Sequence, residues 1–99
     1  HASYAERMKT PPFPGDRIEL LHTFVRIVES GNLSAAAQRL DTTQPTVSRR
    51  LQALERLFGV RLLQRSTHAI TLTPDGERCL AMARALIDEW EAMQETLRG

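Results

Sequence analysis

A polar turn, a proline and a leucine stripe, TTQPTVSRRLQALERLFGV (residues 42–60), constrain the fold more than any other part of this chain. Pro45 fits the first turn of a helix, because its missing N–H would have no intrahelical partner there. The apolar residues then recur at spacings of four, three and four: Val47, Leu51, Leu54 and Phe58. This spacing predicts a helix with one apolar face, and Gly59 is expected to close it.

The outward face of this helix is polar. At 100° per residue the apolar stripe covers about 60° of arc, and the opposite side carries Pro45, Arg49, Gln52 and Arg56. Arg49 therefore points away from the core. Such a face suits a DNA-reading helix, because arginine pairs with guanine and glutamine with adenine in the major groove. The flanking hydroxyls of Thr43, Thr46 and Ser48 are placed to donate to phosphate oxygens.

Two helices are predicted before this one. Asp16 suits the N-cap of the first, whose apolar residues recur at three- and four-residue intervals: Leu20, Leu21, Phe24, Val25 and Val28. Gly31 is expected to end it. Ser34 suits the N-cap of a short second helix with three consecutive alanines. The polar residues 41–43 then form a turn, which gives a helix-turn-helix arrangement.

Beyond Gly59 the period changes. Apolar segments at 62–63 and 70–72 flank a polar stretch and predict a small two-stranded hairpin. Thr73, Pro74 and Asp75 provide a capping hydroxyl, a first-turn proline and an acid at the positive end of a helix dipole. A last helix is therefore predicted over about 74–97. Its apolar residues follow the four-three alternation of a coiled-coil seam: Cys79, Ala83, Leu86, Trp90, Met93 and Leu97.

Positive charge is concentrated in the middle of the chain. Residues 49–74 hold five arginines and one glutamate, whereas residues 1–48 hold five basic and five acidic residues. Residues 75–99 hold three arginines and six acids. A local excess of this kind is expected of a surface that contacts a polyanion. A solvated arginine face is the alternative interpretation.

Several other functions lack their signatures. The histidines His1, His22 and His68 are scattered, and no paired carboxylates, metal-ligand spacing or glycine-rich phosphate loop occurs. We therefore expect neither catalysis nor a cofactor or metal. The single cysteine, Cys79, excludes an internal disulfide framework and fits a reducing cytosol. No apolar run is long enough to span a membrane, so we expect a soluble cytoplasmic protein associated with the nucleoid.

Three stretches carry a family resemblance: LLHTFVRIVESGNLSAAAQRL, TTQPTVSRRLQALERLFGVRLLQR and ITLTPDGE. From Ile18 to about Leu97 the sequence resembles the N-terminal DNA-binding domain of bacterial LysR-type transcriptional regulators. The resemblance implies a mostly α winged helix-turn-helix with a small β-hairpin wing, followed by a long linker helix that pairs two subunits. It also implies an effector-binding C-terminal domain, which we expect to lie outside this stretch of sequence.

Residue by residue, the resemblance implies DNA contacts at the positions that match the family's motif: Ser34, Thr43, Gln44, Pro45, Thr46, Ser48, Arg49 and Arg65. Recognition helix 44–58 would enter the major groove, and wing 65–70 would lie near the minor groove. We add Arg50 as a backbone contact, although it lies toward the core side of the helix. His68 stands at the wing tip where many members have a basic residue, and a solvated loop histidine is the alternative.

The chain is thus expected to have three parts: a disordered leader or cloning remnant over 1–15, a winged helix-turn-helix over 16–73, and a linker and dimerisation helix over 74–99. The seam of the last helix favours pairing with a second chain, because about 24 residues span roughly 36 Å and exceed what so small a domain can cover. Homodimerisation is expected through Ala83, Leu86, Trp90, Met93 and Leu97. Further assembly in the full-length protein stays open. The rival function is a winged-helix protein-interaction module that binds an acidic partner protein.

Overall fold

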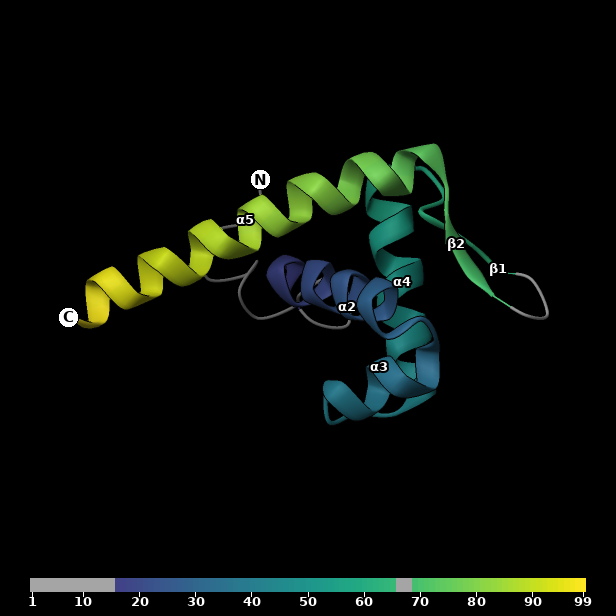
Figure 1. The fold of residues 1–99 in the computed structure, drawn as a ribbon, viewed down its shortest axis with the longest axis horizontal. Helices are drawn as coiled ribbons and strands as arrows, with labels where there is room; N and C mark the ends of the chain where they lie inside the picture. Colours follow the sequence, from purple (N-terminus) through teal and green to yellow (C-terminus); the bar gives the residue numbers. More distant parts are fainter. Residues whose placement is uncertain (1–15, 66–68) are drawn as a thin grey trace, which may run out of the picture.

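The computed structural model describes residues 16–65 and 69–99. The predicted leader and the wing-tip His68 lie outside the described residues. Three helices precede a hairpin and a long fourth helix follows it: α2 (Arg17–Ser30), α3 (Leu33–Arg39), α4 (Gln44–Phe58), β1 (Leu63–Arg65), β2 (Ile70–Leu72) and α5 (Pro74–Arg98). Figure 1 shows α2, α3 and α4 packed together, the hairpin projecting from one side and α5 extending beyond the other. The mostly helical, winged helix-turn-helix prediction is confirmed.

Helix α2 forms the centre of the core. Asp16 caps it as predicted, since its carboxylate accepts a hydrogen bond of 2.7 Å from the Glu19 backbone N–H. Leu20, Phe24 and Ile27 are fully buried, and α2 contacts α3, α4 and α5. Gly31 ends the helix in the left-handed conformation, at φ 83°.

The cap of α3 differs from the prediction. Asn32, not Ser34, is the N-cap, because Asn32 has an extended backbone and its Oδ1 accepts from the Ala35 N–H at 2.7 Å. The helix begins at Leu33, whose side chain is buried in the core. This register places Ser34 inside the first turn. Its hydroxyl is therefore not needed for capping.

Helix α4 begins at Gln44 with Pro45 in its first turn, as predicted, and the structure shows Thr43 as its N-cap. Val47, Leu51 and Leu54 are buried as expected. Phe58, the last member of the stripe, is 52% exposed. The prediction of Phe58 as a core residue is wrong, because the helix ends beyond the edge of the core, next to Gly59.

The hairpin is antiparallel, with Leu63 paired to Leu72 and Arg65 to Ile70. Glu55 ties it to α4, because its Oε2 accepts from the backbone N–H groups of Leu62 at 2.8 Å and Leu63 at 3.4 Å. Glu55 is the one acidic residue of the basic segment 49–74, and its carboxylate is engaged in hydrogen bonds to the backbone before and within β1. It holds the wing at a fixed position beside α4.

The joint between the hairpin and α5 is tightly packed. Thr73 Oγ1 donates to the Arg61 carbonyl at 2.6 Å and accepts from the Gly76 N–H at 2.9 Å. A Cβ on Gly76 would lie 2.0 Å from the Leu62 carbonyl oxygen. Only glycine fits there, because the first turn of α5 lies directly against the backbone that leads into β1.

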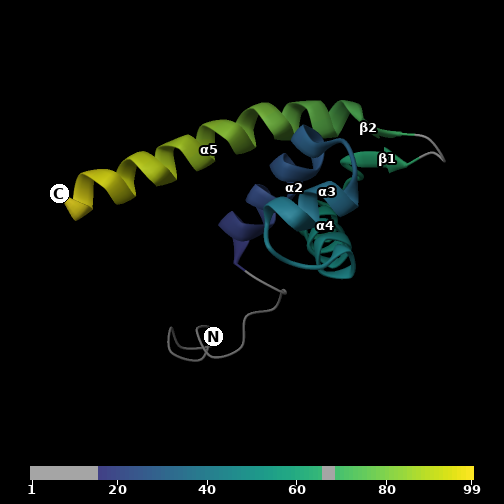
Figure 2. The same cartoon turned by 60° about the horizontal axis from the view of Figure 1, so that its bottom comes forward.

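Helix α5 has two different halves. Cys79, Ala83 and Ile87 are buried against the three-helix core, whereas every residue from 88 onward is exposed. Figures 1 and 2 show this second half running clear of the other helices. Among residues 16–65 and 69–99, no helix has the length and apolar character needed to cross a membrane.

Candidate nucleic-acid interface

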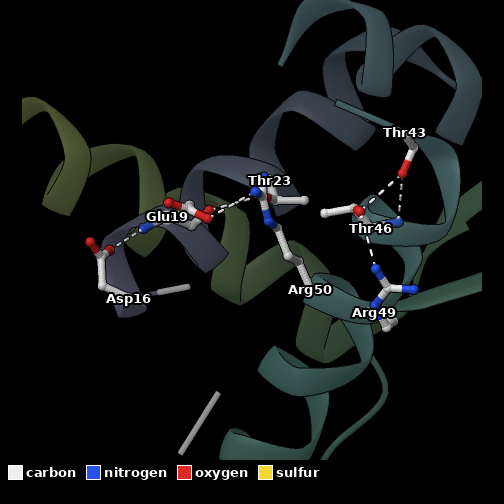
Figure 3. A network of polar contacts seen from close by, with 7 residues as sticks. All are labelled: Asp16, Glu19, Thr23, Thr43, Thr46, Arg49 and Arg50. Carbon is white, nitrogen blue, oxygen red and sulfur yellow. Dashed lines mark hydrogen bonds and ion pairs between the residues drawn. The ribbon is translucent and has the colours of Figure 1, made fainter. Parts of the chain in front are cut away.

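The first turn of α4 holds a chain of hydrogen bonds on the surface. Thr43 Oγ1 accepts from the Thr46 N–H at 3.4 Å, and the two threonine hydroxyl oxygens lie 2.9 Å apart. Arg49 Nη2 donates to Thr46 Oγ1 at 3.2 Å. Figure 3 shows the three side chains following one another along the helix start. The Arg49 guanidinium is exposed and is oriented by its neighbours.

Two further side chains join this face from other elements. Ser34 Oγ on α3 donates to Gln44 Oε1 on α4 at 2.9 Å. Arg65 Nη2 at the end of β1 donates to Ser48 Oγ on α4 at 3.4 Å. With exposed Pro45 between them, the residues predicted from the family motif form one surface. We call this surface the α4 face: Ser34, Thr43, Gln44, Pro45, Thr46, Ser48, Arg49 and Arg65.

Arg50 lies apart from the α4 face. Its Nη2 forms an ion pair of 2.9 Å with Glu19 Oε1 on α2, and its side chain is only 19% exposed. In Figure 3 Arg50 extends toward Glu19 while Arg49 extends toward Thr46. In this structure the Arg50 guanidinium is paired with a carboxylate of the domain and does not join the α4 face. Its role as a DNA-backbone contact stays a prediction.

The remaining arginines of the basic segment keep their charge uncompensated. Within the part of the chain that the structure describes, Arg49, Arg56, Arg61 and Arg65 form no ion pair. Glu55 forms no ion pair with them among the described residues, and its hydrogen bonds go to backbone N–H groups instead. The segment from α4 to β1 is therefore a positive surface that suits a polyanion.

A second exposed surface lies on α5, and it is apolar. Leu86 is 54% exposed, and Trp90, Met93 and Leu97 are exposed too. Ala83, which was predicted to belong to the same seam, is 1% exposed and packs in the chain's own core. The assignment of Ala83 to the pairing surface is therefore wrong, because the first half of α5 uses that face to cover α2. Met82 is exposed and lies four residues before Leu86. We call the exposed residues the α5 stripe: Met82, Leu86, Trp90, Met93 and Leu97.

An apolar groove lies beside the start of this stripe. Exposed Phe58 and Val60, at the end of α4, line it together with Met82, Leu86 and buried Cys79. Burial raises the pKa of the Cys79 thiol above its ordinary value. The thiol therefore stays protonated and behaves as a small apolar wall residue. The groove continues the α5 stripe toward α4.

Sequence reasoning missed three contributors to these surfaces: Asn32, Glu55 and Met82. Asn32 carries the same Asx signal as any N-cap, three residues before the N–H that it binds. Met82 falls outside the four-three spacing of the predicted seam, in which Ala83 precedes Leu86 by three residues, and it joins the exposed face through a spacing of four. The role of Glu55 has no local signal, because its partners are backbone groups seven and eight residues away. Among the described residues, no group of histidine, cysteine and acidic side chains could hold a metal ion.

A helix-turn-helix with a hairpin wing and a basic, hydroxyl-rich helix start defines a winged helix-turn-helix regulator. The model of the bacterial regulatory helix-turn-helix proteins of the lysR family matches residues 18–77. An HTH-type transcriptional repressor of Pseudomonas aeruginosa (strain UCBPP-PA14) is 37% identical over 84 residues, 85% of this chain and 26% of that protein. The chain therefore belongs to the LysR family, and it spans about a quarter of the length of that relative.

Solved structures of the family have the same fold. The CbnR DBD–DNA complex has a TM-score of 0.79 and 37% identity, covering 84% of this chain and 95% of that one. The BenM DBD/catB site 1 DNA complex has a TM-score of 0.80 and 30% identity, covering 84% and 92%. The family consists of regulators, in agreement with the expectation that this chain is not an enzyme.

Proposed function

We propose that this chain is the DNA-binding part of a dimeric LysR-family transcriptional regulator. The α4 face would enter the major groove, and the hairpin would lie near the minor groove. The observation that carries the proposal is the α4 face itself: side chains from α3, α4 and β1 converge there, and its arginines form no ion pair with any residue that the structure describes. The DNA complexes of the two similar domains support it.

The length of each side chain would determine which part of the DNA it contacts. Gln44 and Arg49 are long, exposed and suited to base edges, where a bidentate pair is worth about 1–3 kcal/mol of discrimination. Thr43, Thr46 and Ser48 carry hydroxyls in the first turn of α4 and suit phosphate oxygens. Arg65 would follow the sugar-phosphate backbone from the base of the wing.

The second part of the proposal is pairing through the α5 stripe. The stripe leaves large apolar side chains in water on a helix that extends past its own domain, and burial of such area favours association. A two-fold dimer would present two α4 faces to half-sites about one helical turn or more apart. Residues 16–73 would read DNA and residues 74–99 would link and pair the subunits. We also propose that the full-length regulator has an effector-binding C-terminal domain. It would act at the nucleoid, in the cytoplasm.

Selection of binding sites from a random duplex pool at physiological salt tests the proposal. We expect an enriched motif with two-fold symmetry, which reports base reading and dimeric geometry together. Binding without enrichment would contradict sequence-specific reading. If the chain binds no DNA, the DNA-binding proposal is wrong, and the rival function, a winged-helix module that binds an acidic partner protein, is favoured.

Replacement of Arg49 sharpens the test. Arg49→Ala is expected to weaken binding to the selected site by about 1–3 kcal/mol and binding to random duplex by much less. Arg56→Ala is the matched control, because Arg56 is also exposed on α4 and unpaired among the described residues but lies two turns away. An equal loss on both duplexes would make Arg49 a phosphate contact.

A further inference from the structure

The adjacent arginines Arg49 and Arg50 have partners of different charge. Arg50 pairs with the Glu19 carboxylate at 2.9 Å, so its positive charge is compensated within the domain. Arg49 Nη2 instead donates to Thr46 Oγ1 at 3.2 Å, and Arg49 forms no ion pair with any residue that the structure describes. A hydroxyl oxygen accepts a hydrogen bond without carrying a formal charge. Thr46 therefore holds the Arg49 guanidinium and leaves its charge available to a partner.

The direction of the hydrogen bond between Arg49 and Thr46 is unambiguous. A guanidinium has N–H donors and no acceptor, so the Thr46 oxygen must accept. The contact engages Nη2 alone. The other N–H groups of Arg49 remain available to guanine O6 and N7, which arginine binds with two hydrogen bonds in the major groove.

Thr46 is itself held in place. Its Oγ1 lies 2.9 Å from Thr43 Oγ1, and one of the two hydroxyls donates to the other. Thr43 is the N-cap of α4 and accepts from the Thr46 backbone N–H at 3.4 Å. A β-branched side chain such as that of Thr46 has few rotamers in a helix. The acceptor that Arg49 binds is thus stiff and tied to the cap of the helix (Figure 3).

Holding an arginine in place affects how it reads a base. A freely moving arginine loses rotamer entropy when it pairs with a base, and this loss weakens binding. An arginine whose guanidinium is already held loses less. The advantage is confined to duplexes on which the arginine makes its base contact, so it increases the preference for the correct base.

We propose that Thr46 is a positioning residue that holds the Arg49 guanidinium for guanine recognition while leaving its charge uncompensated. The proposal rests on the DNA-binding function proposed above and concerns how that function selects sequence. It gives Thr46 a role different from a phosphate contact. Arg65 Nη2 donates to Ser48 Oγ at 3.4 Å, which is the same chemistry at the second arginine of the α4 face.

Site selection with a set of variants tests the proposal. Arg49→Ala first identifies the base pair that depends on Arg49. At that pair, Thr46→Val, which removes the hydroxyl and keeps the branched shape, is expected to reduce the preference for guanine about fivefold, which corresponds to about 1 kcal/mol. Preferences at the other positions should not change. Thr46→Ser keeps the hydroxyl and should keep the preference.

The Arg49→Ala background separates positioning from direct contact. If Thr46 acts through Arg49, Thr46→Val should cause no further loss of affinity for the selected site in that background, because no guanidinium is left to hold. If the Thr46 hydroxyl binds a phosphate itself, Thr46→Val will weaken binding equally in both backgrounds. That result would overturn the positioning role.

Thr96→Val is the matched control. Thr96 is also an exposed threonine within a helix, but it lies on the second half of α5, away from the α4 face. This variant should select the wild-type motif. It separates loss of a helical hydroxyl in general from loss of the hydroxyl that holds Arg49.

Failure of the positioning role is distinguishable from failure of the function itself. If the wild type selects no motif, the DNA-reading proposal fails, and the positioning role fails with it. If the wild type selects a motif but Arg49→Ala identifies no guanine, DNA reading stands and the positioning role is overturned. An unchanged preference for that guanine in Thr46→Val would overturn it as well.

Discussion

Helices α4 and α5 both cover the core with one face and leave another face in water, yet the two exposed faces differ in chemistry. The α4 face carries hydroxyls, an amide and two arginines that form no ion pair within residues 16–65 and 69–99. The α5 stripe carries large apolar side chains, while acidic residues such as Asp88 and Glu91 lie elsewhere on the helix. A polar face with uncompensated positive charge suits a hydrated polyanion, whereas an apolar face is stabilised by exclusion of water.

The difference teaches that amphipathic spacing alone does not identify a partner. Both helices show three-four periodicity, and both bury one stripe against α2. The information about partners lies in the residues that the core does not use. On α5 these residues appear only once the position of α2 is known, because Ala83 and Leu86 share the sequence pattern but not the environment.

The largest expected effect comes from breaking the joint that holds the two helices at a fixed angle. Gly76→Ala would place a Cβ 2.0 Å from the Leu62 carbonyl oxygen, and backbone cannot yield there without moving β1. We expect the free energy of unfolding to fall by about 3 kcal/mol, measured by urea denaturation. Glu77→Ala, an exposed neighbour, should change it by less than about 0.5 kcal/mol. An unchanged stability for Gly76→Ala would contradict the close approach.

A smaller effect is expected from placing a charge on the apolar face. Leu86→Asp should weaken self-association at least tenfold, the equivalent of about 1.4 kcal/mol, because an unpaired carboxylate would be buried between subunits. The fold of the monomer should be unchanged, since Leu86 is 54% exposed within one chain. Trp90→Ala should act in the same direction. Light scattering over a concentration series reports the mass.

The control for this variant is Ala85→Asp, an exposed position on α5 outside the stripe. It adds the same charge next to Leu86 and should leave the mass unchanged. If the dimers of both variants dissociate, the added negative charge on α5 causes the dissociation, and the result does not report on the α5 stripe. If neither does, the pairing surface lies elsewhere.

Much of the fold follows from local rules that act over one or two turns. The caps at Asp16 and Thr73 were predicted from the sequence, and each side chain binds an N–H three residues away. The α3 cap was not, since Asn32 and Ser34 both satisfy the local preference and only the burial of Leu33 decides between them. The hairpin itself was predictable from the two short apolar segments that form its strands. Its attachment to α4 through Glu55 was not predictable.

The α4 face was predictable as a set of residues, and the contacts within it were not. The helical wheel separates outward Arg49 from the leucine stripe. The side of α4 that faces a partner can therefore be identified from the sequence alone. Arg50, one residue later, lies at the margin of the wheel, where 100° of rotation leaves its direction ambiguous. Its environment is set by Glu19, thirty-one residues earlier in the chain, and no local pattern reports such a partner.

The smallest expected effect separates these two adjacent arginines. Arg50→Met keeps most of the apolar stem and removes the ion pair with Glu19, so the free energy of unfolding should fall by only about 0.5–1 kcal/mol, since both side chains retain some exposure. Glu19→Gln should cost a similar amount, and the double variant should cost less than the two single losses together, because both remove one interaction. Base preference in site selection should be unchanged by Arg50→Met, in contrast to Arg49→Ala. A changed motif would mean that Arg50 leaves Glu19 to reach DNA, and the α4 face would then include both arginines.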